Sequence, residues 1–389
     1  MAKVLLVDTN FSSAPIYRVL VADGHEVHVV GGNPLDCLAK SAARYWQLDY
    51  SDTGALSTLV DEEAFEFLVP GCTDRSYASC MEAGRGRFPG FDDADAASFI
   101  SHKARFRSLA AELGLPVPMT HAAEAIAHSQ PVIVKPVDAF SGKGITVLRD
   151  ANMSSVAAAI EHARAVSASG ECLVEDYVEG QLYSHSAFLA GQRVVHDFLV
   201  QEDGTANQFV VDTSRVLDSA RFQPLLEDLR RWIETLARHL QLVDGLLHTQ
   251  FIHDGRQTWL IELTRRCPGD LYSQLIELST GCPYARCFAL PFLAQVPEPR
   301  AERGLRPIMR HTITVKQEQG LDHVHFLRNL NIERYVPLSL VGDPLLPSPL
   351  SRVGILFCSE RDQRALDDLY RVTLRRGLVA VSDGTRSHD

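Results

Sequence analysis

Short apolar runs recur along the first hundred residues and are separated by longer amphipathic segments. Residues 4–7, 27–30 and 65–69 are apolar runs of strand length, and the last is closed by Pro70-Gly71. Strands that alternate with helices predict a parallel sheet covered on both faces. No G-x-G-x-x-G motif follows the first run, which argues against a dinucleotide fingerprint.

The pattern changes after about residue 100, where predicted strands follow one another more closely. Ser101 is positioned to cap a helix whose apolar positions 106, 109, 110 and 113 have helical spacing. A second amphipathic helix is predicted at 225–240, with an apolar stripe along one side. The remaining elements predicted here are a helix at 154–168 and strands at 131–136, 145–148, 171–174, 183–189 and 193–201.

The best-defined strand pair is 246–252 with 258–264, joined through an Asp254-Gly255 turn. One antiparallel register would place Gln250 opposite Glu262 and His248 opposite Thr264, with all four side chains on one face. The other face would then carry Leu247, Phe251, Trp259, Ile261 and Leu263. Oxygen atoms of Gln, Glu and Thr suit a hard cation such as Mg²⁺. The same pattern also fits a solvated sheet face without a ligand.

A third region follows the proline-containing segment 297–299. It is expected to contain strands at 312–316, 353–358 and 379–382, and a helix at 363–376.

Composition narrows the class of protein. The 389 residues carry a net charge of −11, which gives no general attraction to nucleic acid or to anionic lipid. No apolar run is long enough for a membrane span. The apolar run near the start of the sequence is too short for the core of a signal peptide. The eight cysteines form no C-x-x-C pair, so reduced thiols in a cytoplasmic protein are expected.

Two segments carry candidate nucleotide-binding chemistry. Lys135 lies at the end of a predicted strand, and the loop after it contains Gly142-Lys143-Gly144. Glycines let backbone N–H groups turn toward an anion, and a lysine adds positive charge. An ordinary hairpin turn with a surface lysine is equally compatible. The strand at 172–176 ends in acids before Gly180, where backbone groups can meet an adenine edge; a plain polar strand end is the alternative.

In order and spacing, these segments resemble the ATP-grasp family of carboxylate–amine ligases over about residues 1–300. Glu262, Thr264 and Arg266, followed by Pro268-Gly269, match the spacing of the family's glutamate, asparagine and arginine. The resemblance implies an α/β (α+β) fold in three parts. These are a Rossmann-like parallel sheet at 1–98, an ATP-grasp domain at 99–298, and a small α+β domain at 299–389. The ATP-grasp domain would have two lobes with antiparallel sheets, at about 115–178 and about 179–298.

The resemblance also implies ATP and Mg²⁺ and gives the site residues their roles. Lys103 and Lys135 would hold phosphates, and Glu262 would bind the metal with Gln250 and Thr264. Arg266, Lys143 and Glu262 would be the catalytic residues. The loop over the phosphates would be formed by Ser141, Gly142, Lys143 and Gly144, and the adenine hinge by Glu175, Asp176, Tyr177 and Val178. Three positions depart from the family: its metal carboxylate falls at Gln250, its asparagine at Thr264 and its ribose glutamate at Leu182, where Glu179 is the nearest substitute.

The implied reaction activates a small carboxylic acid as an acyl phosphate and joins it to an amine or amino acid. Two alternatives stay open: a non-catalytic ATP-binding protein, suggested by Gln250 and Thr264, and a phosphotransferase that stops at the phosphorylated product. Neither a nucleic acid nor a membrane is expected as a partner, and nothing opposes a homodimer. The candidates for substrate contacts are His185, His196, Arg215 and Arg310. Tyr17, Thr73 and Asp74 are further cleft candidates, with turn capping as the alternative; Asp270 is a candidate amine ligand or helix cap.

Overall fold

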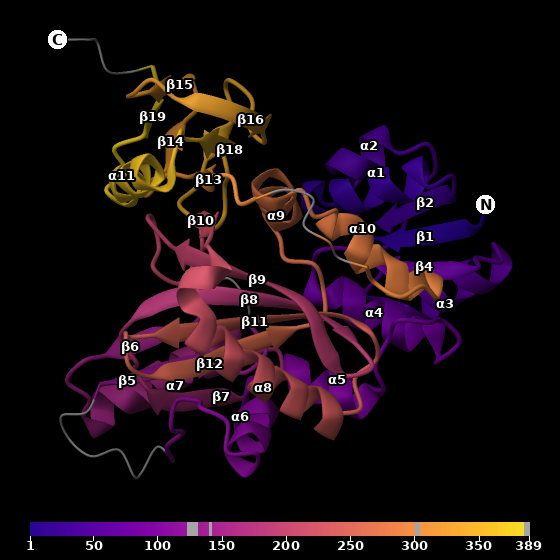
Figure 1. The fold of residues 1–389 in the computed structure, drawn as a ribbon, viewed down its shortest axis with the longest axis horizontal. Helices are drawn as coiled ribbons and strands as arrows, with labels where there is room; N and C mark the ends of the chain where they lie inside the picture. The colour runs from indigo at the N-terminus through magenta and orange to yellow at the C-terminus, as the bar shows by residue number, and fades with distance from the viewer. Residues whose placement is uncertain (123–130, 140–141, 299, 301–303, 385–389) are drawn as a thin grey trace.

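The computed structural model describes residues 1–122, 131–139, 142–298, 300 and 304–384. Figure 1 shows an N-terminal domain on one side, a large central sheet, and the C-terminal elements at one end of that sheet. No helix in the described part of the chain is both long and apolar enough to cross a bilayer.

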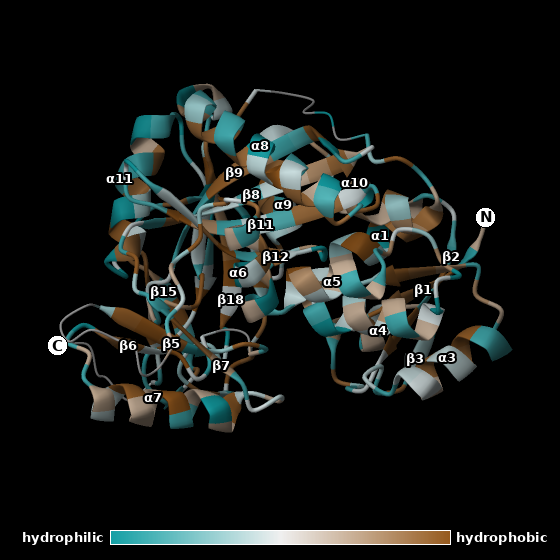
Figure 2. Ribbon diagram, turned by 90° about the horizontal axis from the view of Figure 1, so that it is seen from below, coloured by the Kyte–Doolittle hydropathy of each residue, from teal (hydrophilic) through white to brown (hydrophobic). Residues whose placement is uncertain are grey.

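The N-terminal domain is built on a parallel four-stranded sheet, as its alternating pattern predicts. The strand order is β3-β2-β1-β4, and every neighbouring pair is parallel. The predicted apolar runs form the strands β1 (Lys3–Val7), β2 (Glu26–Gly31) and β4 (Phe67–Pro70). The fourth strand, β3 (Tyr45–Gln47), was not predicted, because its sequence Tyr-Trp-Gln is not an apolar run. The helices are α1 (Ala14–Ala22), α2 (Cys37–Ser41), α3 (Thr53–Glu62), α4 (Asp74–Gly84) and α5 (Ala94–Ser101). Figure 2 shows hydrophobic residues concentrated in β1 and β2 and hydrophilic residues on the helices around them.

A small lobe follows, with its own antiparallel sheet in the order β6-β5-β7. Its elements are α6 (Lys103–Glu112), β5 (Val132–Pro136), β6 (Thr146–Leu148), α7 (Met153–Val166) and β7 (Cys172–Asp176). The prediction that Ser101 caps α6 is wrong. Ser101 is the last residue of α5, so the cap falls to His102, whose Nδ1 accepts a hydrogen bond from the backbone N–H of Arg105 at 3.4 Å.

The largest sheet has eight strands in the order β12-β11-β8-β9-β10-β13-β18-β16. Its first part comprises β8 (Gln181–Ala190), β9 (Arg193–Asp203), β10 (Thr213–Val216), β11 (Gly245–His253) and β12 (Thr258–Thr264). One face packs against α5, α6 and the amphipathic α8 (Gln223–His239). The other face packs against α9 (Tyr272–Thr280), α10 (Tyr284–Ala289) and the N-terminal domain. The candidate active site opens on this second face.

The longer strands of the C-terminal region extend the same sheet, and two short strand pairs form small sheets beside it. It contributes β13 (Ile308–Ile313), β16 (Asn331–Pro337) and β18 (Gly354–Ser359), with α11 (Gln363–Leu374) packed against them. Two further strand pairs are β14 (Gln319–Gly320) with β17 (Pro344–Leu345), and β15 (His323–Phe326) with β19 (Val379–Ser382). The strand predicted at 312–316 begins four residues earlier, because its pairing partners lie on β10 and β18.

Candidate active site

A cavity of about 890 Å³ lies where the N-terminal domain, the small lobe, the central hairpin and the C-terminal strands meet. Most of its lining side chains are polar or charged. The charged ones include Asp74, Lys103, Lys135, Glu175, Glu202, Glu262, Arg266, Asp270, Arg310 and Arg352. Lys135 and Glu262, from different sheets, therefore line one cavity, as the predicted nucleotide site requires.

Lys135 is buried beside two other charged groups. Its Nζ lies 2.6 Å from Glu175 Oε2, and Arg107 Nε lies 2.5 Å from the other oxygen of the same carboxylate. Burial lowers the pKa of Lys135 to about 8, although Glu175 opposes the shift. Burial alone would raise the pKa of Glu175, but Lys135 and Arg107 outweigh it and hold that pKa below its ordinary value.

The side chain of Glu175 thus has a role that sequence reasoning missed, since it neutralises Lys135. In the hinge after it, Tyr177 donates its backbone N–H to Pro131, and Asp176 accepts from His121 Nε2 at 2.6 Å. Glu175, Asp176, Tyr177 and Val178 all line the cavity. That they contact adenine stays a prediction.

Lys103, at the first turn of α6, connects the small lobe to the hairpin. Its Nζ lies 3.5 Å from Glu262 Oε1 and donates a hydrogen bond to Ala139 O at 3.1 Å. Both lysines predicted to bind phosphate are therefore held at the cavity by carboxylates from neighbouring elements.

The glycine loop has the backbone geometry that its sequence predicts. Gly142 and Gly144 have φ values of +70° and +72°, a region that side chains with a Cβ enter only at a cost. Gly142 lines the cavity, whereas Gly144 and the exposed Lys143 do not contact it in this conformation. Ser141 lies outside the described residues.

The predicted hairpin register is confirmed: His248 pairs with Thr264 and Gln250 with Glu262. All four side chains line the cavity. A bulge follows Gln250 and shifts the next pairs, so that Leu260 packs in the core and Ile261 lines the cavity. The expectation that Ile261 lies on the apolar face is therefore wrong. It is also wrong for Trp259, which pairs with the cavity-lining Ile252.

Thr264 and Arg266 are both held by Asp74, the first residue of α4 in the N-terminal domain. Thr264 donates its hydroxyl hydrogen to Asp74 Oδ1 at 2.7 Å, and Arg266 reaches Oδ2 through Nε at 3.1 Å and Nη2 at 3.0 Å. Burial works against ionisation of Asp74, yet Arg266 still holds its pKa below the ordinary value. Asp74 and Thr73 line the cavity, whereas the Tyr17 hydroxyl accepts a hydrogen bond from the Ala43 N–H.

Glu202, at the end of β9, is a site residue that sequence reasoning missed. Its carboxylate accepts hydrogen bonds from Ser184 Oγ and from Gln250 Nε2, both at 2.8 Å. Burial raises its pKa. The predicted strand ended one residue before Glu202, and no motif surrounds it. Alternation along β9 was the one available signal, because it puts Glu202 on the same face as Val200.

Of the four predicted substrate contacts, the structure brings only Arg310 to the cavity. His185 faces the opposite side of the sheet, where its Nε2 lies 2.8 Å from Asp197. Arg215 is also on that side, paired with Asp367 and positioned over the Tyr370 ring. His196 lies farther along β9, with its ring packed against Phe198. Arg215 pairs with Met309, one residue before Arg310. Because side chains alternate along a strand, Arg215 and Arg310 point to opposite faces of the sheet.

Asp270 lines the cavity and forms an ion pair with Arg352, with Nε and Oδ1 3.2 Å apart. It does not cap α9: the residue at the cap position is Leu271, which makes no side-chain cap hydrogen bond. The helix-cap alternative is therefore wrong.

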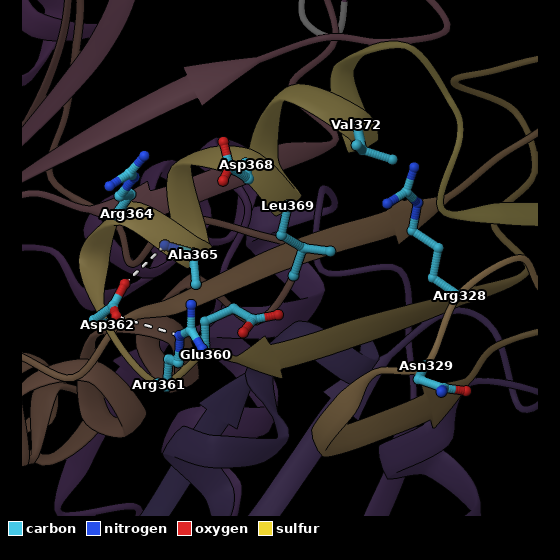
Figure 3. A pocket seen from close by; sticks show the side chains of 10 residues that line it. All are labelled: Arg328, Asn329, Glu360, Arg361, Asp362, Arg364, Ala365, Asp368, Leu369 and Val372. Atoms are coloured by element: carbon cyan, nitrogen blue, oxygen red, sulfur yellow. Dashed lines mark hydrogen bonds and ion pairs between the residues drawn. The ribbon is translucent and has the colours of Figure 1, made fainter.

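A second hollow, of about 800 Å³, lies against α11 in the C-terminal domain (Figure 3). Its charged residues come in both signs, and Asp362 both pairs with Arg361 and caps α11 through the backbone N–H of Ala365. No charge excess points to a ligand there, and the nucleotide chemistry predicted from sequence lies in the first cavity.

Comparison with known families and structures agrees with the sequence resemblance. Residues 128–274 match the family model described as an ATP-grasp domain. Over 149 residues the chain is 34% identical to formate-dependent phosphoribosylglycinamide formyltransferase from Stutzerimonas stutzeri (strain A1501). That match covers 36% of this chain and 37% of the length of the relative.

Solved structures resemble almost the whole chain. The L-amino acid ligase from Bacillus licheniformis superposes with a TM-score of 0.78 at 16% identity, covering 98% of each chain. The phosphoribosylglycinamide synthetase from Anaerococcus prevotii gives 0.74 at 14% identity, covering 98% of this chain and 99% of its own. At these identities the likeness establishes the fold.

Proposed function

We propose that the chain, whose residues 128–274 match an ATP-grasp domain, is an ATP-dependent, ADP-forming ligase that joins a carboxylic acid to an amine. The observation that supports this most is the convergence of Lys103, Lys135, Glu262 and Arg266 on one cavity. The relatives add support, since their names describe a formate-dependent formyltransferase, a synthetase and an amino acid ligase.

In this proposal Lys103 and Lys135 bind the phosphates of ATP, and residues 175–178 hold adenine. Each lysine already faces a carboxylate, Glu262 or Glu175, so each ammonium is oriented before ATP arrives. The glycine loop with Lys143 closes over the β- and γ-phosphates, where its backbone N–H groups add donors.

The donor set also fits Mg²⁺. Glu262 supplies a carboxylate at the cavity, and the side-chain carbonyl of Gln250 supplies a neutral oxygen beside it. Thr264 fits less well, because its hydroxyl hydrogen is engaged by Asp74. In the described part of the chain no three His, Cys, Asp or Glu residues cluster as a metal site, so water and phosphate would complete the coordination. Bound there, the ion would neutralise phosphate charge.

The chemistry needs alignment more than covalent help from the protein. A carboxylate oxygen of the acid attacks the γ-phosphorus, forming an O–P bond as the bond to ADP breaks. The amine nitrogen then attacks the acyl carbon, the C–N bond forms, phosphate leaves and the nitrogen loses a proton. Arg266, held in position by Asp74, and Lys143 stabilise the negative charge on the transferring group.

Incubation of the purified protein with ATP, Mg²⁺ and pools of carboxylic and amino acids tests the proposal. ADP release that needs both pools is the expected result. Release with the acid pool alone would indicate a phosphotransferase, and ATP binding without turnover a non-catalytic protein. Lys135→Ala should abolish ATP binding in every case. Glu262→Ala should spare binding and stop turnover.

The non-catalytic alternative has one observation in its favour. Gln250 and Thr264 each donate a hydrogen bond to a carboxylate, Glu202 or Asp74, and neither contributes charge of its own. A site with a single carboxylate directed at the metal could bind ATP weakly and turn it over slowly. The turnover assay above separates the two functions.

A further inference from the structure

Arg310 is a buried cation without a partner carboxylate in the described part of the chain. Its side chain lines the cavity, the residue is only 3% exposed, and its Nε has no hydrogen-bond partner among the described residues. Nη1 donates to the backbone carbonyl of Asp270 at 2.9 Å, which orients the guanidinium but places no carboxylate in contact with it; Glu202 attracts it without forming an ion pair. A buried charge of this kind is costly unless something neutralises it, so a bound anion is the expected partner.

Glu202 is the complementary group, a buried carboxylate without a partner cation among the described residues. It is 4% exposed, lines the same cavity, and accepts hydrogen bonds only from the neutral donors Ser184 and Gln250. Ser184 and Gln250 fix its orientation, and Arg310 attracts it without an ion pair between the two side chains.

The two charges lie in one row across the sheet. Glu202 on β9 pairs with Ser214 on β10, and Ser214 pairs with Arg310 on β13. Directly paired residues share a face, and two strand spacings put the two Cα atoms roughly 9–10 Å apart. The two side chains form no ion pair with each other, and both line the same cavity, where a small ligand could contact both. Ser214 Oγ, between them, is buried and has no hydrogen-bond partner among the described residues.

We propose that Arg310 and Glu202 bind a free α-amino acid as a zwitterion, with the carboxylate on Arg310 and the ammonium on Glu202, and that this amino acid is the amine substrate. This deepens the ligase function proposed above and rests on it. A planar guanidinium suits a carboxylate, and an acceptor-only carboxylate suits an ammonium group.

The row also sets the direction in which the amino acid lies. Gln250 joins Glu202 to the hairpin, and Gln250 is paired with Glu262. The ammonium end is therefore nearer to Glu262 and the phosphate end of the proposed ATP site, whereas the carboxylate end points to the C-terminal strands. In this orientation the nitrogen faces the activated acid, and its own carboxylate is kept out of the reaction.

A substrate phosphate is less compatible with these residues. Two other arginines of the cavity are already neutralised, Arg266 by Asp74 and Arg352 by Asp270. Arg75, a further arginine of the cavity, lies on α4 in the N-terminal domain and outside this row. A phosphate on Arg310 would place a dianion in the same row as the Glu202 carboxylate.

Thermal-shift titration tests the inference without requiring turnover. The probes are the common L-amino acids, their carboxamides, their N-acetyl forms, ribose 5-phosphate and ATP. We expect one class of free amino acid to raise Tm, and its carboxamide and N-acetyl forms to have little effect. Arg310→Met and Glu202→Gln should each lower the affinity for that amino acid about 10- to 100-fold, while ATP still raises Tm.

Arg215→Met is the matched control, because it removes an arginine from the neighbouring strand on the opposite face. It should leave amino acid affinity within about twofold. Arg310→Lys covers the case in which Arg310→Met fails to fold, and it should also weaken binding because a lysine cannot form the two-pronged contact.

Three results would overturn the inference: carboxamides or N-acetyl forms that bind as well as the free amino acid, binding that survives in both site variants, or stabilisation by ribose 5-phosphate and by no amino acid. These results are distinct from failure of the ligase proposal, which would appear as absent ATP binding or absent ADP release. Binding of amino acids to a protein without turnover would preserve the subsite and refute the ligase.

Discussion

The affinity for ATP should fall as the pH rises above about 8, because Lys135 then loses its proton. The ammonium lies 2.6 Å from Glu175 in a buried position, and burial lowers its pKa from 10.5 to about 8. A neutral amine offers no positive charge to a phosphate. If Lys135 contacts the phosphates, protonation and binding are therefore linked.

The size of the effect follows from that pKa. Below pH 8 most molecules carry the charged lysine, and the dissociation constant should vary little. One pH unit above the pKa only about a tenth of the molecules remain protonated, so the apparent dissociation constant should rise about tenfold. Bound phosphate stabilises the protonated form of Lys135 and so raises its pKa in the complex. The flat part of the pH profile below pH 8 therefore stays distinct from the falling part above it.

Calorimetric titration with ATP and Mg²⁺ from about pH 7 to about pH 9.5 measures this limb. Lys135→Arg should remove it, because arginine stays protonated throughout this range. Lys103→Arg is the control, and the limb should persist there because Lys135 is retained. A flat profile in the unmodified protein, or the same limb in Lys135→Arg, would refute the assignment of Lys135 to the phosphates.

Individual contacts support three further predictions. Asp74→Ala leaves the Arg266 guanidinium uncompensated and should lower the free energy of unfolding by about 3 kcal/mol in urea denaturation, against a small change for the exposed Asp228→Ala. Gly144→Ala adds a Cβ 2.8 Å from Pro136 Cγ at a positive φ and should destabilise by about 2 kcal/mol, whereas Gly170→Ala, with a similar φ and no neighbour within 4 Å, should cost about 1 kcal/mol. Gln250→Glu replaces a hydrogen bond to Glu202 by repulsion between two carboxylates, so Tm should drop in the absence of metal. Added Mg²⁺ should then raise Tm more in this variant than in the parent protein. An equal rise in both proteins would argue against a metal at this face.

The parts of the site that could be predicted from sequence are those set by local geometry. A period of two and an Asp-Gly turn define a hairpin register, so the pairs of Gln250 with Glu262 and His248 with Thr264 could be inferred from the residues of the two strands alone. Glycine at 142 and 144 permits the positive φ values found there, but the residue type alone does not dictate them. The bulge after Gln250 could not be inferred, because nothing in the sequence of that strand marks it.

Contacts between distant segments lay beyond sequence reasoning. Thr264 and Asp74 are 190 residues apart, and their hydrogen bond depends on how the N-terminal domain packs on the central sheet. His185 and Arg215 were plausible substrate contacts by residue type alone, yet strand alternation turns both away from the cavity. The C-terminal strands belong to the central sheet for a similar reason, since their pairing with β10 is a long-range choice.

The two neutral positions of the motif take on a different meaning once those contacts are known. Gln250 and Thr264 lack charge, but each hydrogen-bonds to a carboxylate from another element, Glu202 on β9 and Asp74 on α4. Carboxylates are therefore still present at the cavity, but they belong to β9 and α4 and contact the hairpin through Gln250 and Thr264. Since Asp74 belongs to the N-terminal domain, the site is complete only when that domain is docked, and separating it should release Arg266 as well as a carboxylate. A count of carboxylates along the hairpin motif alone thus misses Glu202 and Asp74, which the fold brings to the same cavity.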